Sequence, residues 1–591
     1  MTEAKERIIR LREAAVIALA AVLVYLPALR GGFVFDDSVL LVEQPFVHAA
    51  DGLRRIWFTA EAPDYYPVTW TAWWVQWLLW GAKPLGFHIV NVLLHALNAV
   101  LVALVLRRLD VRGSWIAALI FAVHPVNVAA VAWISEQKTT LSMLFFLMTV
   151  LAYLRFERGG QWRWYATSVG CYLLSLLAKP AAVMWPVVLL GLALWKSRRV
   201  TRRDLGCCLP FVVLSAVIGL LTVWFQAVRV LGGQPARTDG FLARLTGAGW
   251  AVWFYFFKVA APVRLTMIYP RWEIDPSRPV VYVPALLLVL LLAYCWHNRR
   301  SWGRDVVAGA GYYIVMLFPV LGFFDQGFYR YSFVADHWQY VPIIGVIALT
   351  VGGTVSTMTQ WEHSQQQTAR VAATVVIVCL GALTWNQSQV YFDEETLWRD
   401  TIAKNPSAWL AHYNLGVTLA ARGKLGEAVL AYEAALRLKP DNADALNNLA
   451  LALQGKPDEA IALWRQAVRC QPDHIDAHNN LGAAYAERGD FNHAALQFSL
   501  VLILKPDDAA AHANLGTVYL NQGKLQKAVE QFQAALRADP SMTPVRLSLG
   551  VTLARLARFP EASETFQEVL RVDPMNQAAR TGLEQLGRTN Q

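Results

Sequence analysis

Long apolar runs recur along the first two-thirds of the chain and are separated by short basic or polar segments. Runs of this length predict membrane-spanning helices. We predict eleven spans, at about 14–29, 87–106, 114–123 with an extension toward 131, 138–154, 164–177, 183–195, 207–225, 281–296, 306–321, 340–357 and 371–387.

Basic residues orient these predicted spans. They precede the first span and follow the second, fourth and sixth, which places the N-terminus and those span ends in the cytoplasm. Residues 241–262 are apolar enough to cross, but crossing would move the Asn298-Arg299-Arg300 turn outside. We therefore expect 241–262 to be an interfacial or re-entrant helix on the outer side. The C-terminal part is then extracytoplasmic.

Residues 30–86 form a large first outer loop in this topology. It is rich in aromatic residues: Trp57, Tyr65, Tyr66, Trp70, Trp73, Trp74, Trp77 and Trp80. Such rings favour helices lying in the membrane interface. A platform on which a sugar stacks is the alternative, and we prefer the interfacial anchor.

A 34-residue period appears after about residue 393. Leu415-Gly416 recurs as Leu481-Gly482, Leu515-Gly516 and Leu549-Gly550, and one copy between the first two is two residues short near Gly455. This is the tetratricopeptide (TPR) period. We predict an all-α chain with a membrane domain at 1–392, a half repeat or junction at 393–406, five TPR repeats at 407–576 and a capping segment at 577–591.

Composition agrees with a polytopic helical membrane protein that carries a soluble tail. Hydrophobic residues make up 56% of the 591, charged residues only 16%, and mean hydropathy is +0.34. The net charge of +10 comes mostly from clusters at span ends, so we reject nucleic acid as a partner. The six cysteines form no C-x-x-C motif and no disulfide framework. The N-terminal apolar stretch lacks a clear cleavage site and is typical of an uncleaved anchor.

Two adjacent carboxylates, Asp36 and Asp37, follow the first span in G-G-F-V-F-D-D-S. Carboxylates this close to an apolar span are costly unless they are solvated, paired or used. We interpret them as the mouth of a membrane-embedded active site. The alternative is that they cap a short helix in the loop.

Further polar residues from distant segments share the predicted outer face. They are His124 in A-V-H-P-V-N, Glu136 and Lys138 in S-E-Q-K, Lys179 in L-A-K-P, Arg271 in I-Y-P-R-W, and Asp336, His337 and Tyr340 in A-D-H-W-Q-Y-V-P. His88, Asn91, His95 and Asn98 form one helical stripe, for which helix–helix hydrogen bonding is the expected role of His95 and Asn98. His88 is open to either role. No P-loop, dinucleotide fingerprint or G-x-S-x-G elbow is present in the sequence.

These motifs, followed by TPRs, resemble the transmembrane and TPR repeat-containing O-mannosyltransferases and their bacterial relatives, within the GT-C glycosyltransferases. The resemblance covers essentially the whole chain. It departs at Lys179-Pro180 and Asp336-His337, where many relatives have Lys-Glu and Asp-Arg.

The resemblance implies a polyprenyl-phosphate sugar donor and a Ser/Thr acceptor in a protein recruited by the TPRs, at the outer face of a bacterial inner membrane. Asp36 or Asp37 would be the general base. Lys179, Arg271 or Lys138 would bind the donor phosphate. The remaining residues would orient the substrate: His88, His124, Glu136, Asp336, His337 and Tyr340. We predict no metal ligand, because His124 and Glu136 lack a metal-binding spacing, although a divalent ion stays open as a cofactor.

Two alternatives use the same residues differently. One is a non-catalytic TPR scaffold anchored in the membrane, which would need only one or two spans. The other is a ligase or transporter of lipid-linked oligosaccharide. The sequence specifies neither the sugar nor the acceptor.

Overall fold

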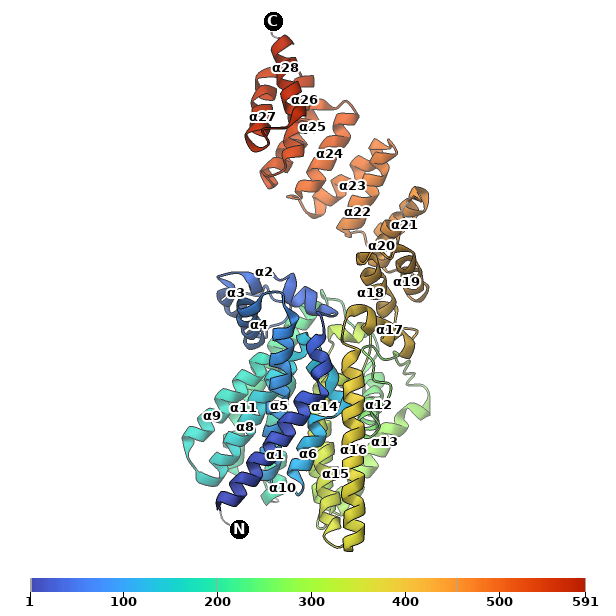
Figure 1. The fold of residues 1–591 in the computed structure, drawn as a ribbon. Coiled ribbons are helices and arrows are strands. Elements are labelled where there is room, and N and C mark those ends of the chain that lie inside the picture. Colours follow the sequence, from blue (N-terminus) through green and yellow to red (C-terminus); the bar gives the residue numbers. More distant parts are fainter. Residues whose placement is uncertain (1–2, 198, 454, 590–591) are drawn as a thin grey trace. The chain divides into compact units, whose positions relative to one another are not determined.

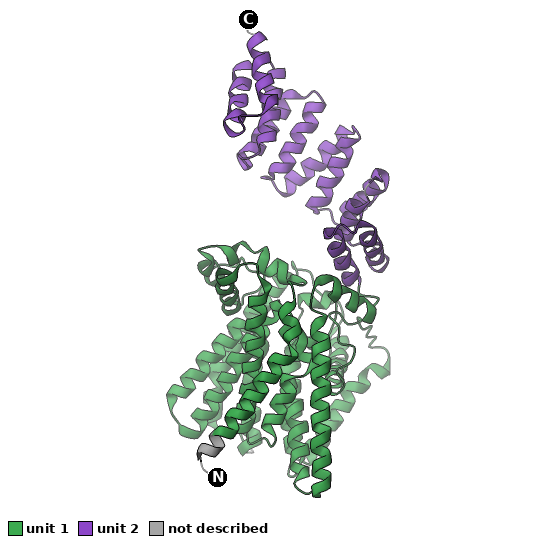
Figure 2. Ribbon diagram, viewed as in Figure 1, with its two compact units in different colours: residues 1–408 green, residues 409–591 purple. Residues whose placement is uncertain are grey.

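The computed structural model describes residues 3–197, 199–453 and 455–589, and every regular element in these ranges is helical (Figure 1). Two compact units are present, Met1–Ala408 and Trp409–Gln591 (Figure 2). The first unit holds the apolar helices and the second holds the repeats.

Each of the eleven apolar ranges contains a helix in the structure. These helices are α1 (Glu3–Val24), α5 (Pro84–Arg108), α6 (Ser114–Ala122), α8 (Gln137–Gly159), α9 (Trp162–Ala178), α10 (Trp185–Ser197), α11 (Arg202–Phe225), α13 (Val283–His297), α14 (Gly303–Leu317), α15 (Ile343–Met358) and α16 (His363–Gln389).

By length and composition, five helical stretches of the described chain can cross a membrane: Pro84–Arg108, Ile134–Gly159, Arg202–Val230, Pro279–His297 and His363–Gln389. A sixth span results if one bent helix pair is counted. The first unit is therefore a multi-pass membrane domain. α12 (Phe241–Ala260), the predicted interfacial helix, is not among these candidates.

The third predicted span is broken. α6 ends at Ala122, η3 (Pro125–Asn127) and α7 (Val128–Ala132) follow, and the two parts meet at 51°. Pro125 has no N–H to donate and restricts the residue before it. Side chains satisfy two of the freed carbonyls, since Asn127 donates to Phe121 O at 2.8 Å and Thr384 donates to Val123 O at 2.6 Å.

The polar stripe on α5 faces other helices, as expected. Asn91 donates to Val131 O at 2.8 Å and Asn98 donates to Thr140 O at 2.8 Å. His95 Nδ1 lies 2.8 Å from the Tyr340 hydroxyl. These fully buried side chains join α5 to α8 and to the turn before α15.

The first outer segment folds as a small helical layer. α2 (Pro45–His48), α3 (Gly52–Phe58) and α4 (Pro67–Trp80) lie at the end of the bundle away from the N-terminus (Figure 1). Trp70 and Trp73 are each 2% exposed and pack in its hydrophobic core. The interfacial interpretation is wrong for these two rings, because burial leaves them no surface to offer to lipid or sugar.

The second unit stacks helices in pairs: α18 (Trp409–Ala421), α19 (Leu425–Leu438), α20 (Ala443–Ala452), α21 (Pro457–Cys470), α22 (Ile475–Glu487), α23 (Phe491–Leu504), α24 (Ala509–Asn521), α25 (Leu525–Ala538), α26 (Thr543–Arg555), α27 (Phe559–Val572) and α28 (Gln577–Thr589). The last two residues of the predicted capping segment, 590–591, lie outside the described residues.

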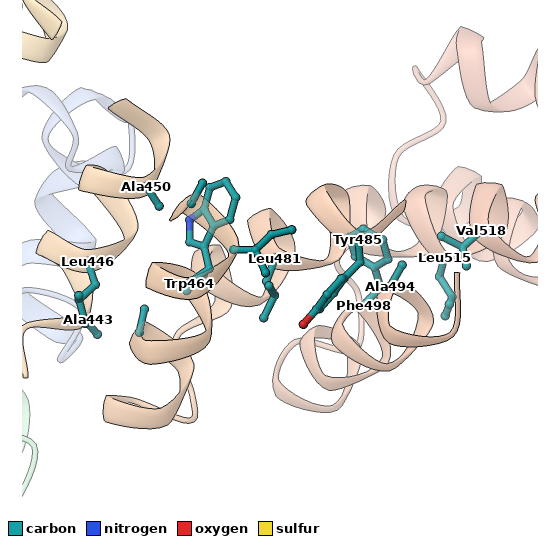
Figure 3. Packing of buried hydrophobic residues seen from close by; sticks show 14 residues of the cluster. Ala443, Leu446, Ala450, Trp464, Leu481, Tyr485, Ala494, Phe498, Leu515 and Val518 are labelled. Atoms are coloured by element: carbon teal, nitrogen blue, oxygen red, sulfur yellow. The ribbon is translucent and has the colours of Figure 1, made fainter. Parts of the chain in front are cut away.

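Small residues let paired helices of this unit approach. A Cβ on Gly482 would lie 2.9 Å from the Phe498 ring, and one on Gly516 would lie 2.7 Å from the Phe532 ring. Figure 3 shows Phe498 in a continuous row of buried side chains that runs from Ala443 to Val518. The short repeat loses its residues mainly from the end of the first helix, because α20 has 10 residues where α18 has 13.

Candidate active site

The loop that carries the two aspartates is held against the end of α16. Gly32 N–H donates to Phe392 O at 2.9 Å. A Cβ on Gly31 would lie 3.0 Å from Tyr391 O and 3.1 Å from His88 Nε2, so glycine permits the close approach. Phe35 has φ of +53°, which is a strained conformation for a side chain of this size. Its ring packs on Trp133 and Trp398, with centroids 5.7 and 5.3 Å away.

The two carboxylates have different surroundings. Asp37 is fully buried and accepts from Val34 N–H at 3.0 Å, from Ser135 N–H at 2.7 Å and from the Ser135 hydroxyl. Asp36 as a residue is partly exposed, whereas its Oδ1 is buried and accepts no hydrogen bond. Asp37 thus ties the loop to the short 3-10 segment just before α8, while one oxygen of Asp36 has no donor.

Burial raises the pKa of both aspartates. The pKa of Asp37 reaches about 7, chiefly through burial and secondly through the negative charge of Asp36, against the opposing hydrogen bonds from Ser135 and Val34. Burial also raises the pKa of Asp36, and the positive charge of Lys138 opposes that rise.

Glu136 is the centre of an ionic group between the outer loop and the helix ends. It ends η4 (Ile134–Glu136), is 1% exposed and pairs with Lys179 Nζ at 2.8 Å and Lys138 Nζ at 3.2 Å. His337 Nε2 lies 3.8 Å from it. Thr139 donates to Glu136 and accepts from Lys179 at 2.8 Å.

We call Asp36, Asp64, Glu136, Lys138, Lys179 and His337 the acid–base cluster. Two ammonium groups, those of Lys138 and Lys179, share one buried carboxylate, Glu136, at its centre. The side chains of Lys138 and Lys179 are 14% and 17% exposed, whereas the Glu136 side chain is almost fully buried, so the cations face accessible space. Burial lowers the pKa of His337 to about 3, which leaves its ring neutral. Such a group suits an anionic ligand that also needs a nearby base.

Asp64 belongs to this cluster and was not among the residues that the sequence predicted. Its Oδ1 accepts from Gln226 Nε2 at 2.6 Å, and the charges of Lys138 and Lys179 act on it. Burial raises the pKa of Asp64. Trp70 Nε1 donates to the Asp64 carbonyl at 3.1 Å, which fixes its backbone. The sequence feature that could have indicated Asp64 is an acidic residue between two prolines, in A-P-D-Y-Y-P.

Five predicted site residues have other contacts. Arg271 is exposed and stacks on Phe333, 4.9 Å from the ring centroid. Asp336 accepts from the Tyr269 hydroxyl at 2.9 Å, and burial raises the pKa of Asp336 to about 7. The other three contact the bundle: Tyr340 lies on His95, His124 Nε2 faces Val259 O at 3.1 Å, and His88 lies against Gly31.

The described residues do not offer a metal site. No group of three or more His, Cys, Asp or Glu side chains among them is placed to hold a metal ion. The Glu136 oxygens already face Lys138, Lys179 and Thr139.

Family profiles match the repeats. Profiles described as "TPR repeat" cover residues 416–456 and 450–489, and profiles described as "Tetratricopeptide repeat" cover 494–543 and 519–586. Among solved structures, a TPR protein titled YrrB, "with an unusual peptide-binding site", is 22% identical over 32% of this chain and 97% of its own, with a TM-score of 0.30. MamA from Desulfovibrio magneticus RS-1 is 23% identical over 29% of this chain and 97% of its own, with a TM-score of 0.27.

Curated relatives match both parts of the chain. Human protein O-mannosyl-transferase TMTC1 is 26% identical over 74% of this chain and 56% of its own length. Human TMTC4 is 25% identical over 71% of this chain and 65% of its own length. Caenorhabditis elegans F38B6.6, with the same description, is 23% identical over 73% and 63%. The chain thus spans between half and two-thirds of the length of these relatives, and it is a TPR-containing homologue of the TMTC protein O-mannosyl-transferases.

Proposed function

We propose that the chain is a membrane glycosyltransferase that moves a sugar from a polyprenyl-phosphate donor to Ser or Thr of a protein on the outer side of the membrane. The observation that carries this proposal is the acid–base cluster. Three segments far apart in sequence bring Asp36, a carboxylate with one unpartnered oxygen, near the ionic group formed around Glu136 by Lys138 and Lys179. The homology to protein O-mannosyl-transferases supports the same reaction class.

The proposed step is one displacement at the anomeric carbon. The acceptor hydroxyl oxygen forms a bond to that carbon while Asp36 takes its proton. The bond between the anomeric carbon and the phosphate oxygen breaks, and the lipid phosphate keeps the electron pair. Lys138 and Lys179 neutralise the charge that develops there. Attack opposite the phosphate inverts the anomeric centre.

We infer different roles for the two aspartates from their contacts. A base needs an acceptor atom that is not already engaged, and Asp36 Oδ1 meets this condition. Asp37 already accepts three hydrogen bonds, so we infer that it positions the loop.

The rest of the proposed arrangement follows from the topology. In the eleven-span topology the cluster and the TPR unit share the outer side. The TPRs recruit the acceptor protein, since TPR arrays form extended concave surfaces suited to binding protein segments.

The test compares exported proteins from cells with and without this chain by intact-mass and glycopeptide analysis. The proposal predicts Ser/Thr-linked glycan that depends on the chain and disappears in a strain carrying Asp36→Asn at equal protein level. A matched strain carrying Asp51→Asn, in the same outer segment but outside the cluster, should keep the glycan.

Two outcomes would contradict the proposal. Unchanged glycosylation without the chain favours a non-catalytic scaffold. A chain-dependent oligosaccharide added as one block favours the ligase alternative. Because the measurement detects the sugar on the acceptor protein, it applies whichever polyprenyl-phosphate donor the cell supplies.

A further inference from the structure

Two adjoining cavities lie among α5, α8, α10, α14 and α15, and their lining includes no residue of the acid–base cluster. Their volumes are about 700 and about 510 Å³, and they share Val188, Leu192, Trp195, Ala308 and Tyr312 on α10 and α14. Volumes of roughly 300–1,000 Å³ are typical of small-molecule sites. The proposed reaction makes no use of this space.

The smaller cavity, which we call the α10–α14 groove, has an apolar body and a basic end. Val187, Leu194 and Val315 are among its apolar lining residues. Arg299, Arg300 and Arg304 line it as well, in the turn after α13 and the first turn of α14. An apolar channel that ends in cations matches a molecule with a hydrocarbon tail and an anionic head.

The charges at this end are not cancelled. Among the described residues, the acid beside the arginines is Asp305, 3.9 Å from Arg304 Nε, and it also accepts from Trp195 Nε1 at 2.8 Å. Arg299 stacks on the Trp296 ring at 4.8 Å and donates to Trp296 O, which holds it at the rim. Arg299 and Arg300 are exposed. Two of the three arginines therefore keep their full charge for a ligand.

The groove also borders a lipid-facing helix. Along the candidate span containing α13 only 11% of residues are buried, and Leu286, Val289 and Leu290 are each more than half exposed. Gly311 leaves the groove open, since a Cβ built there would meet nothing within 4 Å. One end of the groove, at Trp296, therefore adjoins a helix whose apolar surface is largely uncovered by the rest of the chain.

We propose that the α10–α14 groove binds an anionic phospholipid, with one acyl chain along α10 and α14 and the phosphate at Arg299 and Arg300. Basic pockets between membrane helices are suited to anionic headgroups. Arginines that only orient a membrane span would not select one lipid over another. Here the cations lie at the end of an apolar groove, so the headgroup and the acyl chain of one lipid can bind at the same place.

The test uses the purified full chain in detergent, titrated with phosphatidylglycerol and phosphatidylcholine of identical acyl chains and read by native mass spectrometry. We expect phosphatidylglycerol to bind about tenfold more tightly or better. The double variant R299Q/R300Q should reduce it to the phosphatidylcholine level. Gly311→Leu should weaken both lipids, because its side chain fills the groove.

Matched controls separate this site from general surface charge. R202Q/R203Q removes two arginines from α11, which line neither cavity, and should leave phosphatidylglycerol binding unchanged. Gly206→Leu adds the same side chain at another open position and should have no effect. Equal binding of the two lipids to the unmodified chain, an equal loss in R202Q/R203Q, or unaltered binding in Gly311→Leu would each overturn the proposal.

Discussion

Asp36 and Asp37 are neighbours in sequence, yet their contacts predict opposite consequences for the same substitution. Asp36→Asn keeps the shape of the side chain but cannot take a proton, so transfer should fall by about 10²–10⁴ with the protein level preserved. Asp37→Asn places an amide N–H where a backbone or hydroxyl donor now points. Asp37→Asn should therefore lower the free energy of unfolding by about 1–3 kcal/mol. Its effect on turnover should be smaller than that of Asp36→Asn.

The measurement is turnover with a polyprenyl-phosphate sugar and a Ser/Thr peptide, beside the melting temperature of each purified variant. Full turnover in Asp36→Asn would remove this residue from the mechanism. If Asp37→Asn were the inactive but stable variant, the two roles would have to be exchanged.

A base with a raised pKa gives a specific pH dependence. The base acts only when ionised, so turnover should fall as pH drops through its pKa. Burial raises the pKa of Asp36 and brings that of Asp37 to about 7, and ordinary aspartates titrate near 4. We expect kcat/KM to decline on acidification at a pH above the ordinary aspartate range, because burial raises the pKa of the proposed base, Asp36. A profile that stays flat down to about pH 4, where ordinary aspartates titrate, would show that no raised carboxylate limits the reaction.

Lys179 should act mainly on the donor. Lys179→Met removes one of the two cations at Glu136, and a charge-assisted contact is worth roughly 1.5–3 kcal/mol. The apparent KM for the polyprenyl-phosphate sugar should therefore rise about tenfold or more. Lys83→Met, an exposed lysine before α5, is the control. An unchanged donor KM in Lys179→Met would make Lys179 a structural partner of Glu136.

At this scale the sequence predicted several members of the acid–base cluster. Glu136, Lys138, Lys179 and His337 follow apolar-run boundaries on one predicted face, and the structure brings them together. Asp64 was missed because its place depends on how Gln226 and Trp70 hold the outer segment, which no local pattern encodes. Arg271 shares the same predicted face but stacks on Phe333. The predicted face alone could not exclude Arg271, because residues on one side of a membrane need not belong to one site.

At the scale of the elements, the helical repeats depend on glycines that face aromatic rings. In Gly516→Ala the new Cβ would lie 2.7 Å from Phe532, so the pair α24–α25 must shift. Overpacking of this kind typically costs about 1–3 kcal/mol, more than the roughly 1 kcal/mol that alanine gains over glycine in a helix. Hydrogen exchange of the full chain should show faster exchange in α24 and α25.

Gly426→Ala is the matched control. It lies in α19, and a Cβ there meets nothing within 4 Å. Alanine should therefore slow exchange slightly in α19. Equal protection in Gly516→Ala and the unmodified chain would mean that Phe532 moves aside without cost.

The elements were predictable where periodicity was strong. Apolar length and the 34-residue repeat located the helices, because each is a local property of the chain. The sequence placed the end of the third span at His124-Pro125, but it predicted neither the bend between α6 and α7 nor the folded outer segment, since both depend on distant partners. Trp73 illustrates the reason: an aromatic residue in a loop has the same sequence signal whether it meets lipid or packs in a core with Phe46 and Trp70.

For the whole molecule, the remaining prediction is the membrane topology. Reporters fused after Asn298 and after Gln591 should give a cytoplasmic and an extracytoplasmic signal, respectively. The physical reason is that the turns after the second, fourth and sixth predicted spans are basic. Basic turns between membrane spans stay on the cytoplasmic side. The same rule keeps Arg299 and Arg300 inside only if α12 does not cross. An outside signal at Asn298, or a cytoplasmic one at Gln591, would place α12 across the membrane or remove another span, and the acid–base cluster would then have to be assigned a side independently of the TPR unit.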